Sequence, residues 1–194
     1  MVNRVVCENG IDFAPDAYAL LLCKECAEAL GKLQLPAEIE ASVKAYLEAV
    51  GDVFDPSDIH TLTAMVEGKL VQIVLAGCGK GKDCKPNNFR NACGEAIRKL
   101  RELKAKNVAV MAPIIMNPKR GHYLQAIAEG LYLGAYSFDK YKSEAKVPAK
   151  TTLGIKNDIP NGAEILQRAE IIAEAVSFAR DLVNEPGNVV YPEI

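Results

Sequence analysis

The sequence predicts an α/β protein, a three-layer α/β/α sandwich on a mixed sheet, with a long helix near its carboxyl end. Three observations predict this fold class. Apolar runs of strand length alternate with segments of helical periodicity. The run at 70–76 leads through a glycine-rich turn and a helix to a second run at 107–112, as in a parallel crossover. Residues 59–66 and 70–76 flank Glu67-Gly68-Lys69, a hairpin signal that adds an antiparallel pair.

The first part of the chain supplies two strands and a helix. Residues 2–7 form a short apolar strand candidate, and a turn follows at 8–10. The unbroken apolar run at 17–23 predicts a strand buried on both faces, whereas 26–33 fits no single element. Pro36 then opens a helix that Gly51 ends. Its expected inward face comprises Ile39, Val43, Tyr46, Leu47 and Val50.

Two further helices and a strand follow the hairpin. The helix after the glycine turn has one apolar face, formed by Phe89, Ala92, Cys93, Ala96, Ile97, Leu100 and Leu103. A long helix over 119–138 buries Tyr123, Ile127, Leu131 and Phe138. Gly130 and Gly134 lie on that face, and each costs about 1 kcal/mol against alanine in a helix interior. We therefore expect a closely packed partner there, and a further strand at 151–155.

The last helix is predicted from Asn161, which can cap it, with Glu164 completing a reciprocal capping box. Apolar residues then recur at helical spacing: Ile165, Ala169, Ile172, Val176, Ala179 and Val183. Asn184-Glu185-Pro186-Gly187 is a stop signal. Tyr191-Pro192-Glu193 then reads as a new helix start, so we expect the natural protein to continue.

Composition limits the function classes. The chain has 194 residues, 49% of them apolar and 25% charged, which is typical of one soluble globular core. Its net charge of −2 gives no general attraction to nucleic acid or an anionic membrane. Its apolar runs are shorter than the roughly 20 residues that cross a bilayer. The first residues resemble a strand and not a signal peptide, so we expect a cytoplasmic protein with reduced cysteines.

The glycine-rich turn at 77–82 is the most inviting candidate site, because glycines between a strand and a helix let backbone N–H groups approach a phosphate. Its spacing fits neither standard pattern. A P-loop has four residues between its first glycine and its Gly-Lys pair, whereas three residues separate Gly77 from Gly81. Asp83 also stands where a P-loop has the Ser or Thr whose hydroxyl binds the metal. The dinucleotide pattern needs a third glycine at position 82. A plain strand-to-helix turn is therefore favoured, and ligand binding there stays open.

The cysteines and histidines offer weaker candidates. Cys23-Lys24-Glu25-Cys26 has the spacing of a redox pair or half a zinc site, and Cys78 and Cys84, with five residues between them, are loosely spaced for its other half. Ordinary buried thiols are favoured, Cys93 included. His60 and His122 each stand alone, and the basic run 98–106 alternates with acids and leucines as a solvated helix face does. We assign no catalytic, cofactor-binding or metal-binding residue in this chain.

The string Ala-Arg-Asp-Leu-Val-Asn-Glu-Pro-Gly-Asn-Val-Val-Tyr-Pro-Glu at 179–193 resembles the domain junction of the leucyl (cytosol) aminopeptidases, the two-metal exopeptidases of the M17 type. Weaker similarity, in the order of elements, runs over roughly 70–160. The resemblance implies an amino-terminal α/β domain similar to the macro (ADP-ribose-binding) fold. A long helix would join it to a catalytic domain that holds two divalent metals, zinc or manganese. The family's Asn-Thr-Asp-x-Glu-Gly-Arg motif does not occur here.

By this resemblance, residues 1–160 form the α/β domain, 161–186 the linker helix and 187–194 the start of the catalytic domain. The expected partners are that catalytic domain and further copies in a hexamer, with no membrane and no nucleic acid. The apolar stripe at 165–183 would lack its natural partner, so the chain is expected to self-associate through it. Two alternatives remain: a free-standing macro-like module that binds ADP-ribose or a related nucleotide at 77–82, and a DNA-binding regulator.

Overall fold

The computed structural model of the protein describes residues 5–24, 30–56, 58–80, 84–142 and 150–189. Within them, six strands form one mixed sheet in the order β1-β6-β5-β2-β4-β3. The strands are β1 (Val5–Asn9), β2 (Ala17–Leu22), β3 (Ile59–Val66), β4 (Lys69–Gly77), β5 (Asn107–Met111) and β6 (Thr151–Lys156). Neighbouring strands are parallel except β3, which pairs antiparallel with β4. The hydrophobic pattern thus predicted the mixed sheet correctly.

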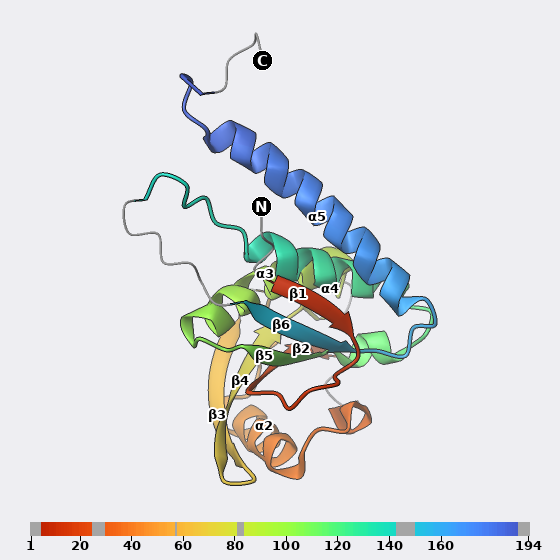
Figure 1. Ribbon diagram of the computed structural model, residues 1–194. Helices are drawn as coiled ribbons and strands as arrows, with labels where there is room; N and C mark the ends of the chain where they lie inside the picture. Colours follow the sequence, from red (N-terminus) through yellow and green to blue (C-terminus); the bar gives the residue numbers. More distant parts are fainter. Residues whose placement is uncertain (1–4, 25–29, 57, 81–83, 143–149, 190–194) are drawn as a thin grey trace.

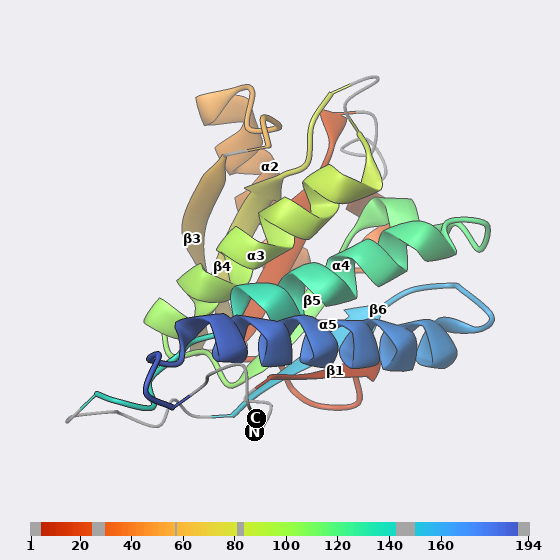
Figure 2. The same cartoon turned by 90° about the horizontal axis from the view of Figure 1, so that it is seen from above.

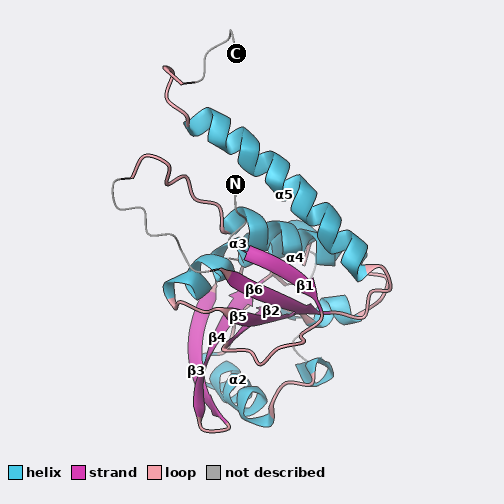
Figure 3. Ribbon diagram, in the orientation of Figure 1, coloured by secondary structure: helices cyan, strands magenta, loops and turns pink. Residues whose placement is uncertain are grey.

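Helices cover both faces of this sheet (Figures 1 and 3). On one face lie α3 (Pro86–Glu102), α4 (Gly121–Gly134) and α5 (Gly162–Asn184), and on the other lies α2 (Ala37–Val50). Two short 3₁₀ helices, η1 (Leu30–Leu33) and η3 (Pro113–Met116), complete the described elements. The predicted three-layer α/β/α architecture is therefore confirmed.

The central strand β2 shows why its apolar run is unbroken. Ala19 and Leu21 belong to the core beneath α3 and α4, whereas Leu20 and Leu22 belong to the core beneath α2. All six residues of β2 are buried. Since successive side chains of a strand point to opposite faces, a strand covered by helices on both sides needs apolar residues at every position.

The β3–β4 hairpin closes as the sequence predicted. Glu67 and Gly68 have φ values of 47° and 76°. Two consecutive residues with positive φ are typical of the type I′ turn, whose twist matches that of the flanking strands. The pairing then runs without interruption from Val66 opposite Lys69 to Ile59 opposite Ala76. The chain from β4 through α3 to β5 is parallel, also as predicted, but β2 lies between these two strands.

The two glycines of α4 meet α3 directly. A Cβ atom added to Gly134 would lie 2.5 Å from Gly94 Cα and 2.6 Å from Gly94 O, and one added to Gly130 would collide with Arg90 O. Figure 2 shows α3 and α4 side by side over the sheet. Only glycine permits this approach, so the predicted close packing partner of α4 is the backbone of α3.

Several predicted details were wrong. Of the strand expected at 2–7, residues 2–4 lie outside the described residues. The described strand reaches Asn9, because residues 5–9 pair in register with β6, and the chain turns at Gly10 with φ 105°. Val50 is 49% exposed because it is the last residue of α2, where Gly51 turns the chain away. The helix predicted to reach Phe138 ends at Gly134, so Phe138 lies beyond it and is only half-buried.

The predicted capping box of α5 does not form. The helix does begin beside Asn161, but the Asn161 side chain makes no capping hydrogen bond. Its φ of −106° and ψ of 32° differ from the extended conformation that brings an N-cap side chain over the first turn. The other end of α5 agrees with prediction, because the helix stops at Asn184, two residues before Pro186.

Candidate functional site

The glycine-rich turn follows β4 at the carboxyl edge of the sheet, beside the end of β2. The chain leaves β2 toward the α2 face and leaves β4 toward the α3 face (Figure 1). Neighbouring strands whose connections depart to opposite faces mark the usual ligand-binding crevice of an open α/β sheet. The turn thus has a suitable position for a bound ligand, and phosphate binding there would require free backbone N–H groups. Gly81, Lys82 and Asp83 lie outside the described residues.

The backbone donors of the first three residues of the turn are already used. The N–H groups of Gly77, Cys78 and Gly79 each donate to a backbone carbonyl oxygen. The acceptors are Asp58 at 2.9 Å, Leu22 at 2.7 Å and Phe54 at 2.6 Å, respectively. A turn that binds phosphate presents free N–H groups to it. These three bonds instead fasten the turn to β2 and to the 52–58 loop.

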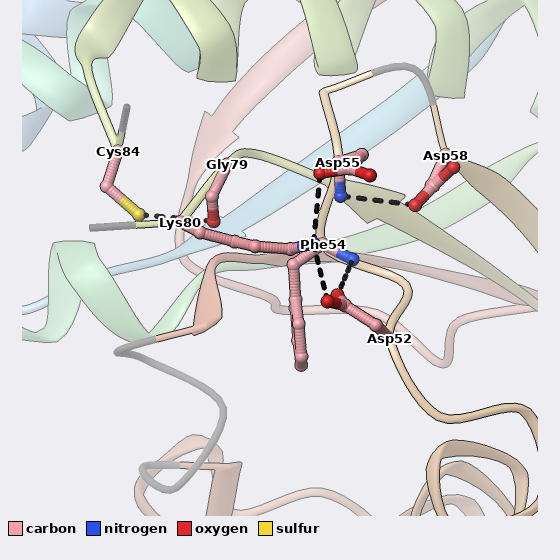
Figure 4. Close-up of polar contacts among 7 residues, drawn as sticks. All are labelled: Asp52, Phe54, Asp55, Asp58, Gly79, Lys80 and Cys84. Carbon is pink, nitrogen blue, oxygen red and sulfur yellow. Dashed lines mark hydrogen bonds and ion pairs between the residues drawn. The ribbon is translucent and has the colours of Figure 1, made fainter. Parts of the chain in front are cut away.

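Lys80 is held by two carboxylates of the same loop (Figure 4). Its Nζ lies 2.5 Å from Asp52 Oδ2 and 3.1 Å from Asp55 Oδ1, and the Asp55 N–H donates to Asp58 Oδ2 at 3.1 Å. Hydrogen bonds to the two carboxylates raise the pKa of Lys80, and the bond from Lys80 lowers the pKa of Asp52. A phosphate at this lysine would face two competing negative charges, so the geometry favours the plain turn.

Four cysteines, Cys23, Cys78, Cys84 and Cys93, lie near one another beside the turn. The sequence did not predict this cluster. Burial, with smaller contributions from the neighbouring thiols of Cys93, Cys23 and Cys84, raises the pKa of Cys78 well above its usual value. The Cys78 thiol donates to Ala76 O at 3.6 Å. None of the described cysteines is joined in a disulfide. Cys26, the other half of the predicted pair, lies outside the described residues.

The remaining chemical candidates do not assemble into a site. Among the described residues, no group of three or more His, Cys, Asp and Glu side chains is placed to hold a metal ion. His60 Nδ1 is 2.8 Å from the Tyr46 hydroxyl, and the His122 ring lies 4.6 Å from the Tyr123 ring. In the basic run, Arg98 pairs with Glu95 and Lys99 with Glu102, as on a solvated helix face.

Helix α5 has one packed face and one bare face. Its buried side chains are those of Leu166, Ala169 and Ala173, which lie against α4 and β1. The predicted stripe is displaced from this face: Ala169 and half-buried Ile165 belong to the core, but the later members do not. The exposed apolar side chains of α5 are Ile171, Ile172, Val176, Phe178, Leu182 and Val183, between 36% and 85% exposed. We call these six residues the outer face of α5.

The junction string fixes this helix to its own domain through Tyr136. The Tyr136 hydroxyl donates to Asp181 Oδ1 at 2.9 Å and accepts from Asn184 Nδ2 at 3.1 Å. The Arg180 guanidinium lies 5.4 Å from the centre of the Tyr136 ring and donates to Leu133 O at 3.3 Å. Three residues of the string thus hold the segment that follows α4.

Glu185 extends this contact beyond the helix end. Its carboxylate accepts from Lys140 Nζ at 2.6 Å and from the Tyr141 hydroxyl at 2.5 Å. Both hydrogen bonds lower the pKa of Glu185. These contacts join segments more than 40 residues apart, and local spacing gave no signal for them. Tyr136, Ala179, Arg180, Val183 and Asn184 also line an open hollow of about 490 Å³ beside the outer face.

Comparison with known proteins shows the family. The model described as "Cytosol aminopeptidase family, N-terminal domain" matches residues 25–145. A probable cytosol aminopeptidase from Clostridium perfringens is 34% identical over 142 residues, covering 70% of this chain and 29% of the relative. One from Alkaliphilus metalliredigens is 36% identical over 145 residues, covering 69% and 28%. The chain therefore spans under a third of the length of these relatives.

Solved structures share the fold. A mutant of tomato leucine aminopeptidase superposes with a TM-score of 0.77 and 20% identity, covering 97% of this chain and 39% of that one. The bottromycin maturation enzyme BotP in complex with Mn gives 0.67 and 21%, covering 93% and 34%. No helix in the described ranges is long and apolar enough to cross a membrane. By the family match over more than half of its length, the chain belongs to the cytosol aminopeptidase family and carries its amino-terminal domain.

Proposed function

We propose that this chain is the non-catalytic amino-terminal domain of a leucyl aminopeptidase that removes amino-terminal residues from peptides. Residues 1–160 are the α/β domain, 161–186 the linker helix and 187–194 the start of the catalytic domain. The observation that carries the proposal is the match to the amino-terminal family model over residues 25–145. Its support is the small share, 28–29%, of the two relatives that the chain covers.

The two divalent metals of the proposed enzyme, zinc or manganese, belong to its catalytic domain. The residues described here do not fit them, because no group of metal-ligating side chains comes together. The chemistry supplied by such metals is the activation of water and polarisation of the peptide carbonyl. This chain's own contribution is structural: it packs on the catalytic domain, shapes access to the active site and helps a hexamer assemble in the cytoplasm.

The outer face of α5 supports this structural role. Large apolar side chains on a helix are normally covered by a packing partner. Here one side is covered by α4 and β1, while large side chains such as Phe178, 61% exposed, remain in contact with water. The catalytic domain is the covering partner that fits, since α5 leads directly into the segment assigned to it.

The contacts of the described residues weigh against the two alternative functions. A nucleotide module at the glycine turn would need free N–H groups, but those of Gly77, Cys78 and Gly79 are bonded to carbonyls. A DNA-binding regulator would need a basic surface, but the chain has a net charge of −2, and Arg98 and Lys99 of the basic run pair with Glu95 and Glu102.

Activity of the isolated chain and of the longer natural protein tests the proposal. The longer protein should hydrolyse leucine p-nitroanilide, and a chelator should abolish the reaction, whereas the 194-residue chain should be inactive with zinc or manganese added. The matched control is the chain titrated with ADP-ribose in a calorimeter, where no heat is expected. Hydrolysis by the chain alone, or saturable ADP-ribose binding, would contradict the proposal.

A further inference from the structure

Strand β3 is an unprotected edge of the sheet. It pairs with β4 on one side only, and its eight residues, Ile-His-Thr-Leu-Thr-Ala-Met-Val, include no proline and no Asp, Glu, Lys or Arg. Its pairing with β4 has no bulge. Proteins normally blunt an edge strand with charges, proline, bulges or short length, because free backbone groups recruit further strands. In β3 none of these devices is present.

The register identifies which backbone groups face outward. The Gly77 N–H donates to Asp58 O, so Asp58 directs its carbonyl toward β4. Backbone groups alternate in direction along an antiparallel strand, and even-numbered residues of β3 therefore face β4. The groups of Ile59, Thr61, Thr63 and Met65 face away from the sheet. Within the described part of the chain, no backbone hydrogen bond is formed by these outward groups.

The opposite edge of the sheet, β1, is protected. It has five residues, one of them the charged Glu8, and it is packed by α5 and α4. The Cys7 N–H donates to the Tyr132 hydroxyl of α4 at 3.2 Å. The same sheet thus closes one edge with a side chain from a neighbouring helix and leaves the other open. Of the two edge strands, only β3 therefore presents unpaired backbone groups along its whole length.

We propose that β3 pairs antiparallel with β3 of a second copy of this chain about a twofold axis, joining the two sheets into one. Residues directly opposite in an antiparallel pair point to the same face of the sheet, so odd-numbered residues of β3 must lie opposite odd-numbered residues of the copy. A register with Leu62 opposite Leu62 meets this requirement. That register places Thr61 opposite Thr63 twice and Ile59 opposite Met65. Threonine pairs of this kind stabilise antiparallel strands. The pairing brings no like charges together, because β3 carries none.

A second copy fits this edge because the strand is complementary to itself. A twofold contact uses the same patch on both partners. The side chains of Thr61, Thr63 and Met65 share one face of the sheet and are exposed, so a partner strand meets no covering helix beside them. Leu62, on the other face, is already half-buried under α2 and would be covered further by its copy. This contact shares no residue with the outer face of α5.

The test is a substitution that removes an outward N–H and keeps every backbone hydrogen bond to β4. The bond from the Thr63 hydroxyl to Gln72 Oε1 is lost equally in the test variant and in its control. In Thr63→Pro the lost donor faces away from the sheet, a position where edge strands accept proline. It is made in a background in which Ile172→Glu and Val176→Glu silence the outer face of α5. The matched control, Thr63→Val, keeps the N–H. Mass is measured by sedimentation equilibrium, and folding of each variant by circular dichroism.

The silenced chain and its Thr63→Val variant should both have twice the 21.0 kDa mass of one chain, and Thr63→Pro should reduce it to 21.0 kDa. Amide exchange in the silenced chain provides a readout without substitution in β3. The Thr61 and Thr63 amides should be protected at high concentration and lose protection on dilution. A silenced chain that is monomeric at millimolar concentration, or outward amides whose exchange is independent of concentration, would overturn the proposal.

Discussion

The contact between α3 and α4 and the outer face of α5 lie on the same side of the sheet and differ in almost every respect. Between α3 and α4 the backbones touch through glycine, and Arg90 pairs with the buried carboxylate of Glu129 at 2.7 Å. The outer face of α5 instead presents large side chains to water. Val183 is 85% exposed, although its helix is held at both ends by contacts within the domain.

The α3–α4 contact contributes to the stability of the domain, whereas the outer face of α5 is available for association with a partner. Glycines at a closed contact cannot change without moving a backbone, so the α3–α4 contact determines whether the domain folds. Exposed apolar side chains of α5 gain no free energy from this domain, and burial by a partner would stabilise them by roughly 25 cal/mol per Å². Substitutions in the two regions should therefore affect different measurements.

The largest effect on stability is expected at the closed contact. The Cβ of Gly134→Ala would overlap Gly94 backbone atoms, which cannot rotate away, so the helices must separate. We expect the free energy of unfolding to fall by about 3 kcal/mol, the upper part of the usual range for overpacking. Gly31→Ala, whose added Cβ would meet nothing within 4 Å, is the control. Urea unfolding measures both, and equal stability of the two variants would refute the close contact.

A second effect concerns Cys93, which lies on the same contact. Burial raises the pKa of Cys93 well above its usual value, so the unreactive thiol persists in the folded protein at mildly alkaline pH. Iodoacetamide should leave Cys93 unmodified until urea unfolds the chain, as read by mass spectrometry of its peptides. The Gly134→Ala variant should be modified faster. Rapid modification of Cys93 in the native chain would show that α3 and α4 open readily.

The smallest effect on stability is expected on the outer face of α5. Ile172→Glu with Val176→Glu should change the free energy of unfolding by less than about 0.5 kcal/mol per site, as at other exposed positions. The same pair should abolish self-association through this helix, measured by light scattering. Gln167→Glu, on an exposed position outside that face, is the control. Unchanged oligomeric state in the double variant, with β3 blocked by Thr63→Pro, would rule out association through α5.

Local patterns predicted the strands, the hairpin and the glycine contact because each depends on residues close in sequence. Glu67 and Gly68 determine the β3–β4 turn by themselves, and β2 shows its burial in every residue. The inward face of α5 was misassigned for the opposite reason. Apolar residues surround much of that helix, so periodicity did not distinguish Leu166 and Ala173, which are buried, from Ile172 and Val176.

The glycine turn shows a second limit. Its sequence left phosphate binding open because the acceptors that occupy its donors come from elsewhere, Leu22 in β2 and Phe54 in the loop before β3. The same holds for Lys80, whose charge is compensated by Asp52 and Asp55. No spacing rule reports such distant partners. The structure was needed to show that an inviting turn has no spare donors among its first three residues.

The length of α5 has a mechanical consequence. A helix of 23 residues rises about 35 Å at 1.5 Å per residue. Only its first half packs closely, while Tyr136 and Tyr141 hold its far end through Asp181 and Glu185. A tilt of a few degrees at the packed half would displace that end by roughly 1–2 Å, and the contacts of Tyr136 oppose this movement. The helix is therefore held rigidly at both ends, and it determines the position and orientation of any segment that follows Asn184.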